Sequence, residues 1–309
     1  MAETISNVME NAAQTTDSDP DDFIELMKPR VMSLVVFTAW IGLMVAPGDI
    51  HVLEATVTIA CIAIAAGASG AINMWYDRDI DAVMDRTKAR PIPSGRIRAP
   101  DALSFGMIMA LLAVIVLGLA TNWVSAGLLA FSVFFYAVIY TIWLKRLTPQ
   151  NIVIGGAAGA FPPMIGWAAV TGAIEINSII LFLIIFMWTP PHFWALGLFR
   201  NEDYTKAKVP MLPVVAGEQR TKRQIVIYSA LLVPLGVAPA FTGLAGTLYL
   251  ISASVLGVIF LLGTIAVWRE DGEATGFAAA RRLFGFSILY LFMIFLLLLI
   301  DHEAQTIFA

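Results

Sequence analysis

Cysteine, histidine and charge are all scarce in this chain of 309 residues. A single cysteine, Cys61, excludes an internal disulfide and any metal site built from several cysteines. Only 14% of the residues are charged and 59% are apolar, whereas an average soluble domain is about 25% charged. The composition therefore argues against an ordinary soluble domain, and it gives no reason to expect a nucleic-acid partner.

The apolar residues gather in nine runs, each close to the roughly 20 residues that cross a bilayer core as a helix. They occupy residues 31–46, 53–75, 103–120, 124–144, 152–171, 179–198, 225–242, 248–268 and 283–300. We therefore expect an all-α polytopic membrane protein with nine transmembrane helices in a lipid bilayer, formed by residues 25–309. Residues 1–24 are polar and acidic without a basic start, which predicts a flexible tail rather than a signal peptide.

The basic residues indicate how the chain is oriented. All 19 lysines and arginines lie before the first run or in every second connection between runs. By the positive-inside rule, the amino terminus and the long charged loops are cytoplasmic. The compact chain and the absence of a transit peptide favour the bacterial inner (plasma) membrane over an organelle.

A dense group of charges, "NMWYDRDIDAVMDRTKARP", follows the second apolar run at residues 73–91. Asn73, Asp77 and Asp81 are spaced by four, which places them on one face of a helix. Three oxygen-bearing side chains on one face suit a hard cation, most naturally Mg²⁺. Asn73, Asp77 and Asp81 are therefore predicted metal ligands.

Basic side chains lie next to these acids and predict an anion site. Arg86, Lys88 and Arg90 follow at once, and a site with acids for a metal and bases for an anion suggests a metal–polyphosphate complex. Lys145 and Arg146, on the same side of the membrane, either complete the anion cradle or serve only as topology determinants. Arg86, Lys88 and Arg90, in the first charged loop, have the same alternative of serving only as topology determinants.

Two further features complete the candidate site. The segment "FRNEDYTKAKVPMLPV" at residues 199–214 offers Asp203 and Lys206 as a second half of the clamp. His192, within "WTPPHFWALGLF" at residues 188–199, is the one histidine inside an apolar run. An ionisable side chain at membrane depth is a functional candidate, and a hydrogen-bonded packing role remains the alternative.

Four segments carry a family resemblance: "KPRVMSL" at 28–34, "MDRTKARPIPSGRI" at 84–97, "TPPHFWAL" at 189–196 and "EDYTKAKVPMLPV" at 202–214. The chain resembles the UbiA-type intramembrane prenyltransferases, and within them the branch that farnesylates protohaem IX. The resemblance implies a UbiA-type helix bundle that joins the farnesyl group of farnesyl diphosphate to a vinyl group of haem B, with addition of water, giving haem O. It also implies haem A synthase or terminal-oxidase assembly proteins as partners.

The resemblance assigns roles to the candidate residues. Asn73, Asp77, Asp81 and Asp203 would bind Mg²⁺ and act in catalysis, and His192 would hold the haem iron or a propionate. The diphosphate would be bound by Arg86, Lys88, Arg90, Lys145, Arg146 and Lys206. One departure concerns the second motif, because Ala207 stands four residues after Asp203 where the wider family has a second acid.

Three other functions remain open from the sequence. An aromatic polyprenyltransferase acting on a quinone precursor would share the metal chemistry but would lack "TPPHFWAL". A transporter is disfavoured because nearly all charge lies outside the apolar runs, whereas transporters place charge near the midplane. A haem-carrying electron-transfer protein would need paired histidines within the spans, and only His192 qualifies.

Overall fold

The structure, a computed structural model, describes residues 19–308, which form helices and connecting turns without a strand. Eight helices are long and apolar enough to cross a bilayer, which confirms the predicted all-α membrane fold. They are α4 (Val52–Tyr76), α6 (Ala99–Ala120), α7 (Trp123–Phe134) continued by η1 (Phe135–Leu144), α8 (Asn151–Thr171), α9 (Ile176–Phe199), α11 (Leu212–Val237) continued by η2 (Ala238–Ala240), α12 (Thr247–Arg269) and α14 (Ala278–Phe308).

The first predicted span corresponds to α3 (Pro29–Met44), which is shorter than the others. Its 16 residues rise about 24 Å at 1.5 Å per residue, less than the roughly 30 Å of a bilayer core. Pro29 starts this helix, and Gly48, with a φ of 118°, lies in the turn beyond its end. The nine predicted crossings are thus eight long helices and one short one.

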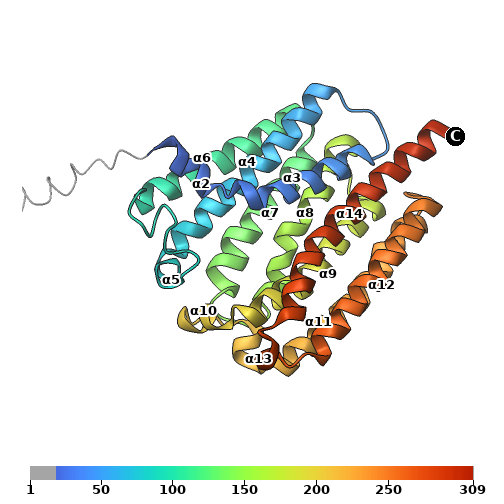
Figure 1. The fold of residues 1–309 in the computed structure, drawn as a ribbon. Coiled ribbons are helices and arrows are strands. Elements are labelled where there is room, and N and C mark those ends of the chain that lie inside the picture. Colours follow the sequence, from blue (N-terminus) through green and yellow to red (C-terminus); the bar gives the residue numbers. More distant parts are fainter. Residues whose placement is uncertain (1–18, 309) are drawn as a thin grey trace, which may run out of the picture.

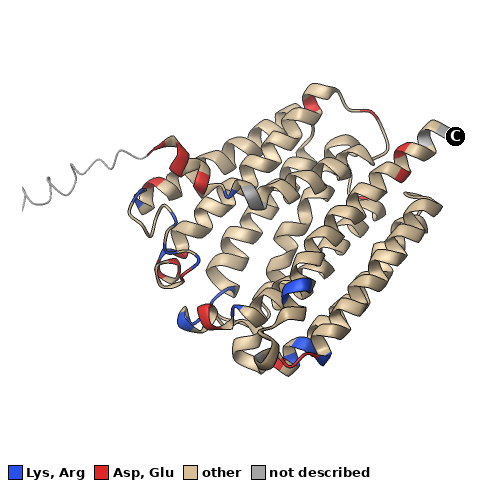
Figure 2. Ribbon diagram, viewed as in Figure 1, with Lys and Arg blue, Asp and Glu red and all other residues tan. Residues whose placement is uncertain are grey.

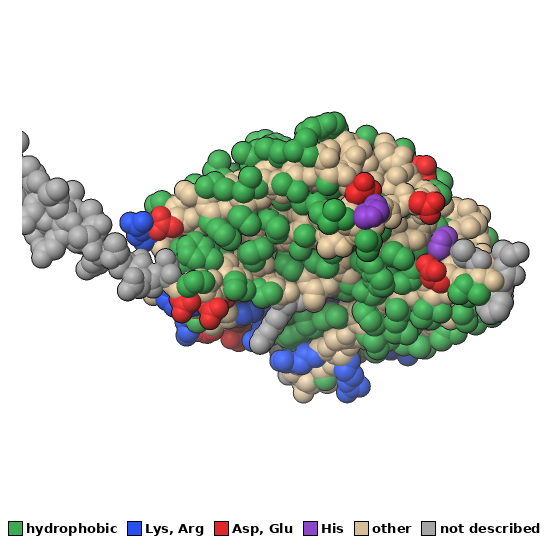
Figure 3. Space-filling view, turned by 90° about the horizontal axis from the view of Figure 1, so that it is seen from above, with side chains coloured by type: hydrophobic (Ala, Val, Ile, Leu, Met, Phe, Trp, Pro, Cys, Tyr) green, Lys and Arg blue, Asp and Glu red, His purple; other side chains and the backbone are tan. Residues whose placement is uncertain are grey.

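Helices α8 and α9 lie at the centre of the bundle. Helix α8 packs against α3 and α9, and α9 also packs against α11 and α14 (Figure 1). Glycines allow the closest of these approaches, because a Cβ on Gly42 would lie 2.2 Å from the Pro163 carbonyl oxygen. Small residues serve this purpose in membrane bundles. Hydrophobic side chains cover most of the face seen in Figure 3, as a lipid-facing surface requires.

Short helices and turns gather the charged side chains at one end of the bundle, where most Lys and Arg residues lie (Figure 2). Three of the short helices are α5 (Arg78–Val83), α10 (Asn201–Lys206) and α13 (Gly272–Thr275). Helix α11 begins at Leu212, 13 residues before the span predicted to start at residue 225. The charged segment is helical because Glu, Gln, Arg and Lys favour helix without being apolar, although Gly217 interrupts it with a φ of 77°.

The predicted tail, residues 1–24, overlaps the described residues only at its end; residues 1–18 lie outside them. Helix α2 (Pro20–Leu26) contains the predicted boundary at residue 24. Arg96 pairs with Asp22 and, at 2.8 Å, with Glu25, and Phe23 packs on Phe105 with ring centroids 5.1 Å apart. This contact could not be predicted from the sequence, because the partners lie more than 70 residues away along the chain.

Candidate active site

Asn73, Asp77 and Asp81 all lie on the inner side of the junction between α4 and α5. The predicted single helix is interrupted at Asp77, whose φ of −87° and ψ of 7° are not helical. The backbone bonds from Asp77 N to Asn73 O (2.9 Å) and from Asp81 N to Asp77 O (2.8 Å) nevertheless keep the four-residue repeat. All three side chains are therefore buried together, with the Asp77 residue fully inaccessible to solvent.

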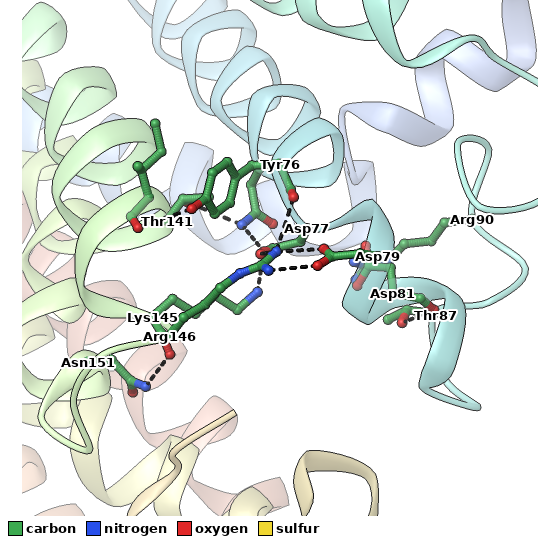
Figure 4. A network of polar contacts seen from close by, with 12 residues as sticks. Tyr76, Asp77, Asp79, Asp81, Thr87, Arg90, Thr141, Lys145, Arg146 and Asn151 are labelled. Atoms are coloured by element: carbon green, nitrogen blue, oxygen red, sulfur yellow. Dashed lines mark hydrogen bonds and ion pairs between the residues drawn. The ribbon is translucent and has the colours of Figure 1, made fainter. Parts of the chain in front are cut away.

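Asp77 is the centre of a polar network that joins α4 to the turn after η1 (Figure 4). Its carboxylate accepts hydrogen bonds from Asn73 Nδ2 at 2.7 Å, from Arg146 at 3.3 Å and from Lys145. Asn73 Nδ2 also donates to Thr141 Oγ1 at 3.1 Å. A buried carboxylate needs such partners, because an unpaired charge in a poorly hydrated interior is strongly unfavourable.

The remaining bases of the first loop divide into two groups. Arg90 forms an ion pair of 2.6 Å with the buried Asp81. Lys88 instead pairs with the exposed Asp85 at 2.7 Å, and within the described residues neither Lys88 nor Arg86 bonds to the three buried side chains. The structure thus brings Arg90, Lys145 and Arg146 to the acids and leaves Arg86 and Lys88 exposed beside them.

Arg146 also pairs with an acid outside the predicted set. Its guanidinium donates to Asp79 at 2.6 and 2.7 Å, and this hydrogen bonding lowers the pKa of the Asp79 carboxyl. The same contact raises the pKa of Arg146. Arg146 thus spans a buried and an exposed acid, which holds the turn after η1 against α5.

The second loop lies against the first. Lys206, at the end of α10, approaches Asp85 of the first loop with Nζ 3.8 Å from Oδ2. Below this contact, Ile80 and Met84 of the first loop pack in one apolar cluster with Ala207, Val209 and Met211 of the second. Asp203 is buried in α10, and its carboxylate forms no hydrogen bond or ion pair in the part of the chain that the structure describes. The two predicted halves of the clamp therefore meet.

His192 lies on α9 in an aromatic sandwich. Its ring stacks on Trp188 with centroids 4.3 Å apart and on Phe284 of α14 at 4.6 Å. Nδ1 is 2.6 Å from Ser287 Oγ, and the Trp188 indole donates to the Ser287 carbonyl at 2.7 Å. Among the described residues Nε2 has no hydrogen-bond partner, so Ser287 orients the ring and leaves its other nitrogen available.

Phe193 connects His192 to the paired loops. Its ring meets His192 edge-on at 5.1 Å and also packs against the apolar cluster below the Lys206–Asp85 contact. The stacked rings around His192 and the charged site are thus two separate groups of side chains, and Phe193 lies between them.

Besides Asp79, two residues of the network were missing from the sequence prediction. Lys28 precedes α3 with a φ of 52°, a left-handed backbone that is uncommon outside glycine, and its Nζ lies 3.1 Å from Asn73 Oδ1. Burial of the ammonium, together with the nearby positive charges of Arg90 and Lys145, lowers the pKa of Lys28 to about 7. Its position just before "PR" at a helix start was a signal, but the prediction used it only for orientation and, within "KPRVMSL", for the family resemblance.

Thr141 is the second missing residue. It is fully buried in η1, the π-helical end of the span that begins at Trp123. Such π-helical turns occur often at functional sites, because the wider turn re-aims side chains. A hydroxyl within a run of apolar and aromatic residues was the available signal.

The donor set fits a magnesium ion shared with a phosphate ligand. Asn73, Asp77 and Asp81 offer amide and carboxylate oxygens, the ligand type that Mg²⁺ prefers. No three His, Cys, Asp or Glu side chains form a ready-made cation site among the described residues.

The fold and site define a membrane-embedded helical protein with an acid–base network at one end of its bundle. The model of the UbiA prenyltransferase family matches residues 34–296. The chain belongs to this family and is a prenyltransferase. A relative from Parvibaculum lavamentivorans, named protoheme IX farnesyltransferase, is 61% identical over 91% of this chain and 88% of its own.

Solved structures share the fold at low sequence identity. A digeranylgeranylglyceryl phosphate synthase superposes with a TM-score of 0.76 and 19% identity, covering 91% of this chain and 98% of its own. A UbiA homologue from Archaeoglobus fulgidus, bound to DMAPP and Mg²⁺, gives a TM-score of 0.63 at 17% identity over 87% and 99% of the two chains. These likenesses confirm the predicted UbiA-type bundle.

Proposed function

We propose that this chain transfers the farnesyl group of farnesyl diphosphate to a vinyl group of protohaem IX, giving haem O. The observation that carries the proposal is the buried row Asn73, Asp77 and Asp81, tied to Arg90, Lys145 and Arg146 in a chain 61% identical to a protoheme IX farnesyltransferase. Residues 25–309 would carry the activity. That relative's name does not favour the aromatic polyprenyltransferase alternative.

Each member of the network has a role in this reaction. Asn73, Asp77 and Asp81 would hold Mg²⁺ from the first loop, and Asp203 would assist from the second. When bound, Mg²⁺ supplies positive charge that stabilises the leaving diphosphate. The homologue from Archaeoglobus fulgidus, which shares the fold, is bound to that ion.

The bases bind the leaving group. Arg90, Lys145 and Arg146, now paired with carboxylates, turn to the diphosphate oxygens when the substrate enters. Arg86, Lys88 and Lys206 add positive charge from the exposed side. Guanidinium and ammonium groups suit phosphate because charge-assisted hydrogen bonds are the strong ones.

The transfer proceeds by loss of diphosphate from the farnesyl group. The C–O bond breaks, its electron pair goes to the diphosphate, and an allylic cation remains, which is sheltered from water by the apolar bundle. The π electrons of a haem vinyl group form the new C–C bond. Water then adds to the resulting cation and loses a proton, which leaves a hydroxyethylfarnesyl side chain.

His192 is the proposed contact for haem. Its ring is fixed by Ser287 at Nδ1, which leaves Nε2 for the haem iron or a propionate. An imidazole held through its other nitrogen is the usual arrangement for a metal-binding histidine. Because Phe193 lies between this ring and the loops, haem bound at His192 would be close to the diphosphate site.

The site would face the cytoplasm of a bacterium. Most Lys and Arg residues lie at the end of the bundle that holds the network, which favours the cytoplasmic side of the inner membrane for this end and for the amino terminus (Figure 2). The resemblance supplies haem A synthase and terminal-oxidase assembly proteins as candidate recipients of the product.

A reconstitution experiment tests the function. The purified full chain is incubated with haem B, farnesyl diphosphate and Mg²⁺, and the pigment is analysed by mass spectrometry. We expect haem B to gain the mass of one farnesyl group and one hydroxyl group. Unmodified haem, together with prenylation of an aromatic acid supplied in its place, would replace this proposal with the quinone-precursor alternative.

A haem titration tests His192 separately. His192→Ala should weaken haem B binding by about 10- to 100-fold, the range seen when support for a bound metal is lost, and leave farnesyl diphosphate binding within twofold. Ser287→Ala, which frees the ring but keeps it, is the matched control and should give a smaller loss. Unchanged haem affinity in His192→Ala would remove this residue from the site.

A further inference from the structure

A groove with both polar and apolar lining lies between the first turns of α11 and the end of α12, outside the proposed active site. Its volume is about 670 Å³. The side chains that line it come from five positions of α11 and one of α12: Gln219, Arg220, Arg223, Gln224, Ile227 and Trp268. Residues 220, 223, 224 and 227 recur every three or four positions, so they share one face of α11.

The groove is positively charged and uncompensated. Arg220 and Arg223 are exposed, and neither guanidinium has a hydrogen-bond or ion-pair partner within the described part of the chain. Lys222, between them, is instead fully buried and pairs with Glu218 at 2.6 Å. Each arginine therefore offers its whole set of donors to a ligand.

The nearby acid is already committed. The Glu270 carboxylate accepts hydrogen bonds from the backbone nitrogens of Ala279 and Ala280 at the start of α14, at 2.7 and 3.3 Å. Its backbone carbonyl accepts from Lys222. Glu270 thus serves to fix the α12–α14 connection, and it does not neutralise the two arginines in the groove.

An apolar surface continues from the groove along the two helices. Ile227 and Leu231 are exposed on α11, as are Leu262 and Ile265 on α12. Trp268, 45% exposed, stands at the boundary between the charged groove and this apolar strip, where tryptophan is enriched in membrane proteins. The surface thus presents the two arginines at one end and exposed apolar side chains, suited to face lipid, along the rest of its length.

We propose that this groove binds the phosphate headgroup of an anionic phospholipid, with its acyl chains along α11 and α12. Basic pockets between membrane helices recognise such headgroups. Two guanidiniums without acid partners fit the phosphate, and the two glutamines can donate to a polar headgroup. None of the residues belongs to the prenyl-transfer site, so the proposal stands apart from the proposed function.

Native mass spectrometry of the detergent-purified full chain tests the proposal. The chain is titrated with dioleoylphosphatidylglycerol, dioleoylphosphatidylcholine or soluble glycerol phosphate. We expect tight binding of one phosphatidylglycerol and weaker binding of the other two ligands. The double variant Arg220→Gln/Arg223→Gln should lose about thirtyfold in affinity for phosphatidylglycerol, since each arginine near an anionic surface is worth about fivefold.

The control variant Arg98→Gln/Arg282→Gln removes two exposed arginines outside the groove and makes the same change of net charge. It should bind phosphatidylglycerol like the unchanged chain, and prenyl transfer in detergent should remain unchanged in both double variants, which reports on folding. Equal losses in the two double variants, or equal binding of phosphatidylcholine, would overturn the proposal. Glycerol phosphate binding as tightly as the lipid would overturn the lipid assignment and indicate a soluble phosphate ligand.

Discussion

The two loops that meet at the charged end of the bundle both bury aspartates, Asp77 and Asp81 in the first and Asp203 in the second, but in opposite circumstances. In the first loop Asp77 accepts hydrogen bonds from Asn73, Lys145 and Arg146. In the second loop the Asp203 carboxylate has no such partner among the described residues. The buried acids of the first loop are thus paired with bases from that loop and from the turn after η1, whereas Asp203 has no paired base among the described residues.

The difference shows how such a site can be stable before its substrate arrives. Burial of an unpaired carboxylate is costly, so the first loop needs its bases simply to keep two acids in place. We infer that these bases exchange carboxylates for diphosphate when Mg²⁺ supplies the carboxylates with a new partner. Asp203 gives up no partner on binding, so the two loops should respond differently to the same substitution.

Substitutions of Asp77 and Asp203 should differ most in their effect on turnover. Asp77→Asn should lower farnesyl transfer by about 10³-fold, the upper range for removal of one group that stabilises transition-state charge. Asp203→Asn should lower it by only about 10- to 100-fold, the range for an assisting position at a metal site. Product formation is measured by chromatography of the extracted haem at saturating farnesyl diphosphate.

The control for this comparison is Asp79→Asn, which removes an exposed carboxylate that bonds only to Arg146 among the described side chains. It should retain turnover within a few-fold of the unchanged chain. Wild-type turnover in Asp77→Asn would remove the metal-site assignment. Equal losses at Asp77 and Asp203 would show that both loops contribute ligands of equal weight.

The free energy of unfolding should also differ between variants of Asp77 and variants of Asp203. Asp77→Ala leaves Lys145 and Arg146 without their buried partner, and the loss of one partner of a buried pair costs about 3–5 kcal/mol. Both bases are partly exposed, at 19% and 30%, so we expect about 2 kcal/mol. Asp203→Ala should change stability by less than about 0.5 kcal/mol or increase it slightly.

The measurement is thermal unfolding of both variants in one detergent, without substrate. For a chain of 309 residues, with an unfolding entropy of about 2.1 cal/mol/K per residue, 2 kcal/mol corresponds to a decrease in Tm of about 3 °C. A destabilised Asp203→Ala would mean that its carboxylate has a partner in solution. The comparison between the loops would then no longer hold.

The sequence was informative where the relevant order is local. Hydropathy over about 20 residues predicted the long helices, and the spacing of four put Asn73, Asp77 and Asp81 into one buried row despite the break at Asp77. Both properties depend on neighbours within a few turns of the chain. The family resemblance was likewise confirmed by the match over residues 34–296.

The missing features depend on contacts between distant parts of the chain. Lys28 reaches Asn73 across 45 residues, Thr141 across 68, and Ser287 reaches His192 across 95. No periodicity in a single sequence encodes such pairs. The same holds for the division of the predicted bases into Arg90, which contacts a buried acid, and Lys88, which faces solvent.

Substitution of a base in each loop should differ in the same direction as substitution of the aspartates, but with smaller effects. Arg90 of the first loop pairs with buried Asp81 at 2.6 Å, whereas Lys206 of the second is 55% exposed and 3.8 Å from Asp85. Arg90→Gln should raise the KM for farnesyl diphosphate about tenfold, and Lys206→Gln by about two- to threefold, since exposed charges are screened by water and salt. Initial rates at 50 and 300 mM salt check both values, and a larger effect at Lys206 would reverse the proposed weights.

The smallest effect is expected for substitution of Asp85, whose contact between the two loops is an exposed ion pair. Asp85, 64% exposed, pairs with Lys88 of its own loop and with Lys206 of the other. Asp85→Asn removes both contacts, yet exposed ion pairs contribute little, so Tm should shift by no more than about 1 °C and turnover by no more than about twofold. The loops would still be held by the apolar cluster that includes Met84 and Met211. A large loss of turnover in Asp85→Asn, with Met84→Ala tolerated, would mean that charge rather than apolar packing joins the two halves of the site.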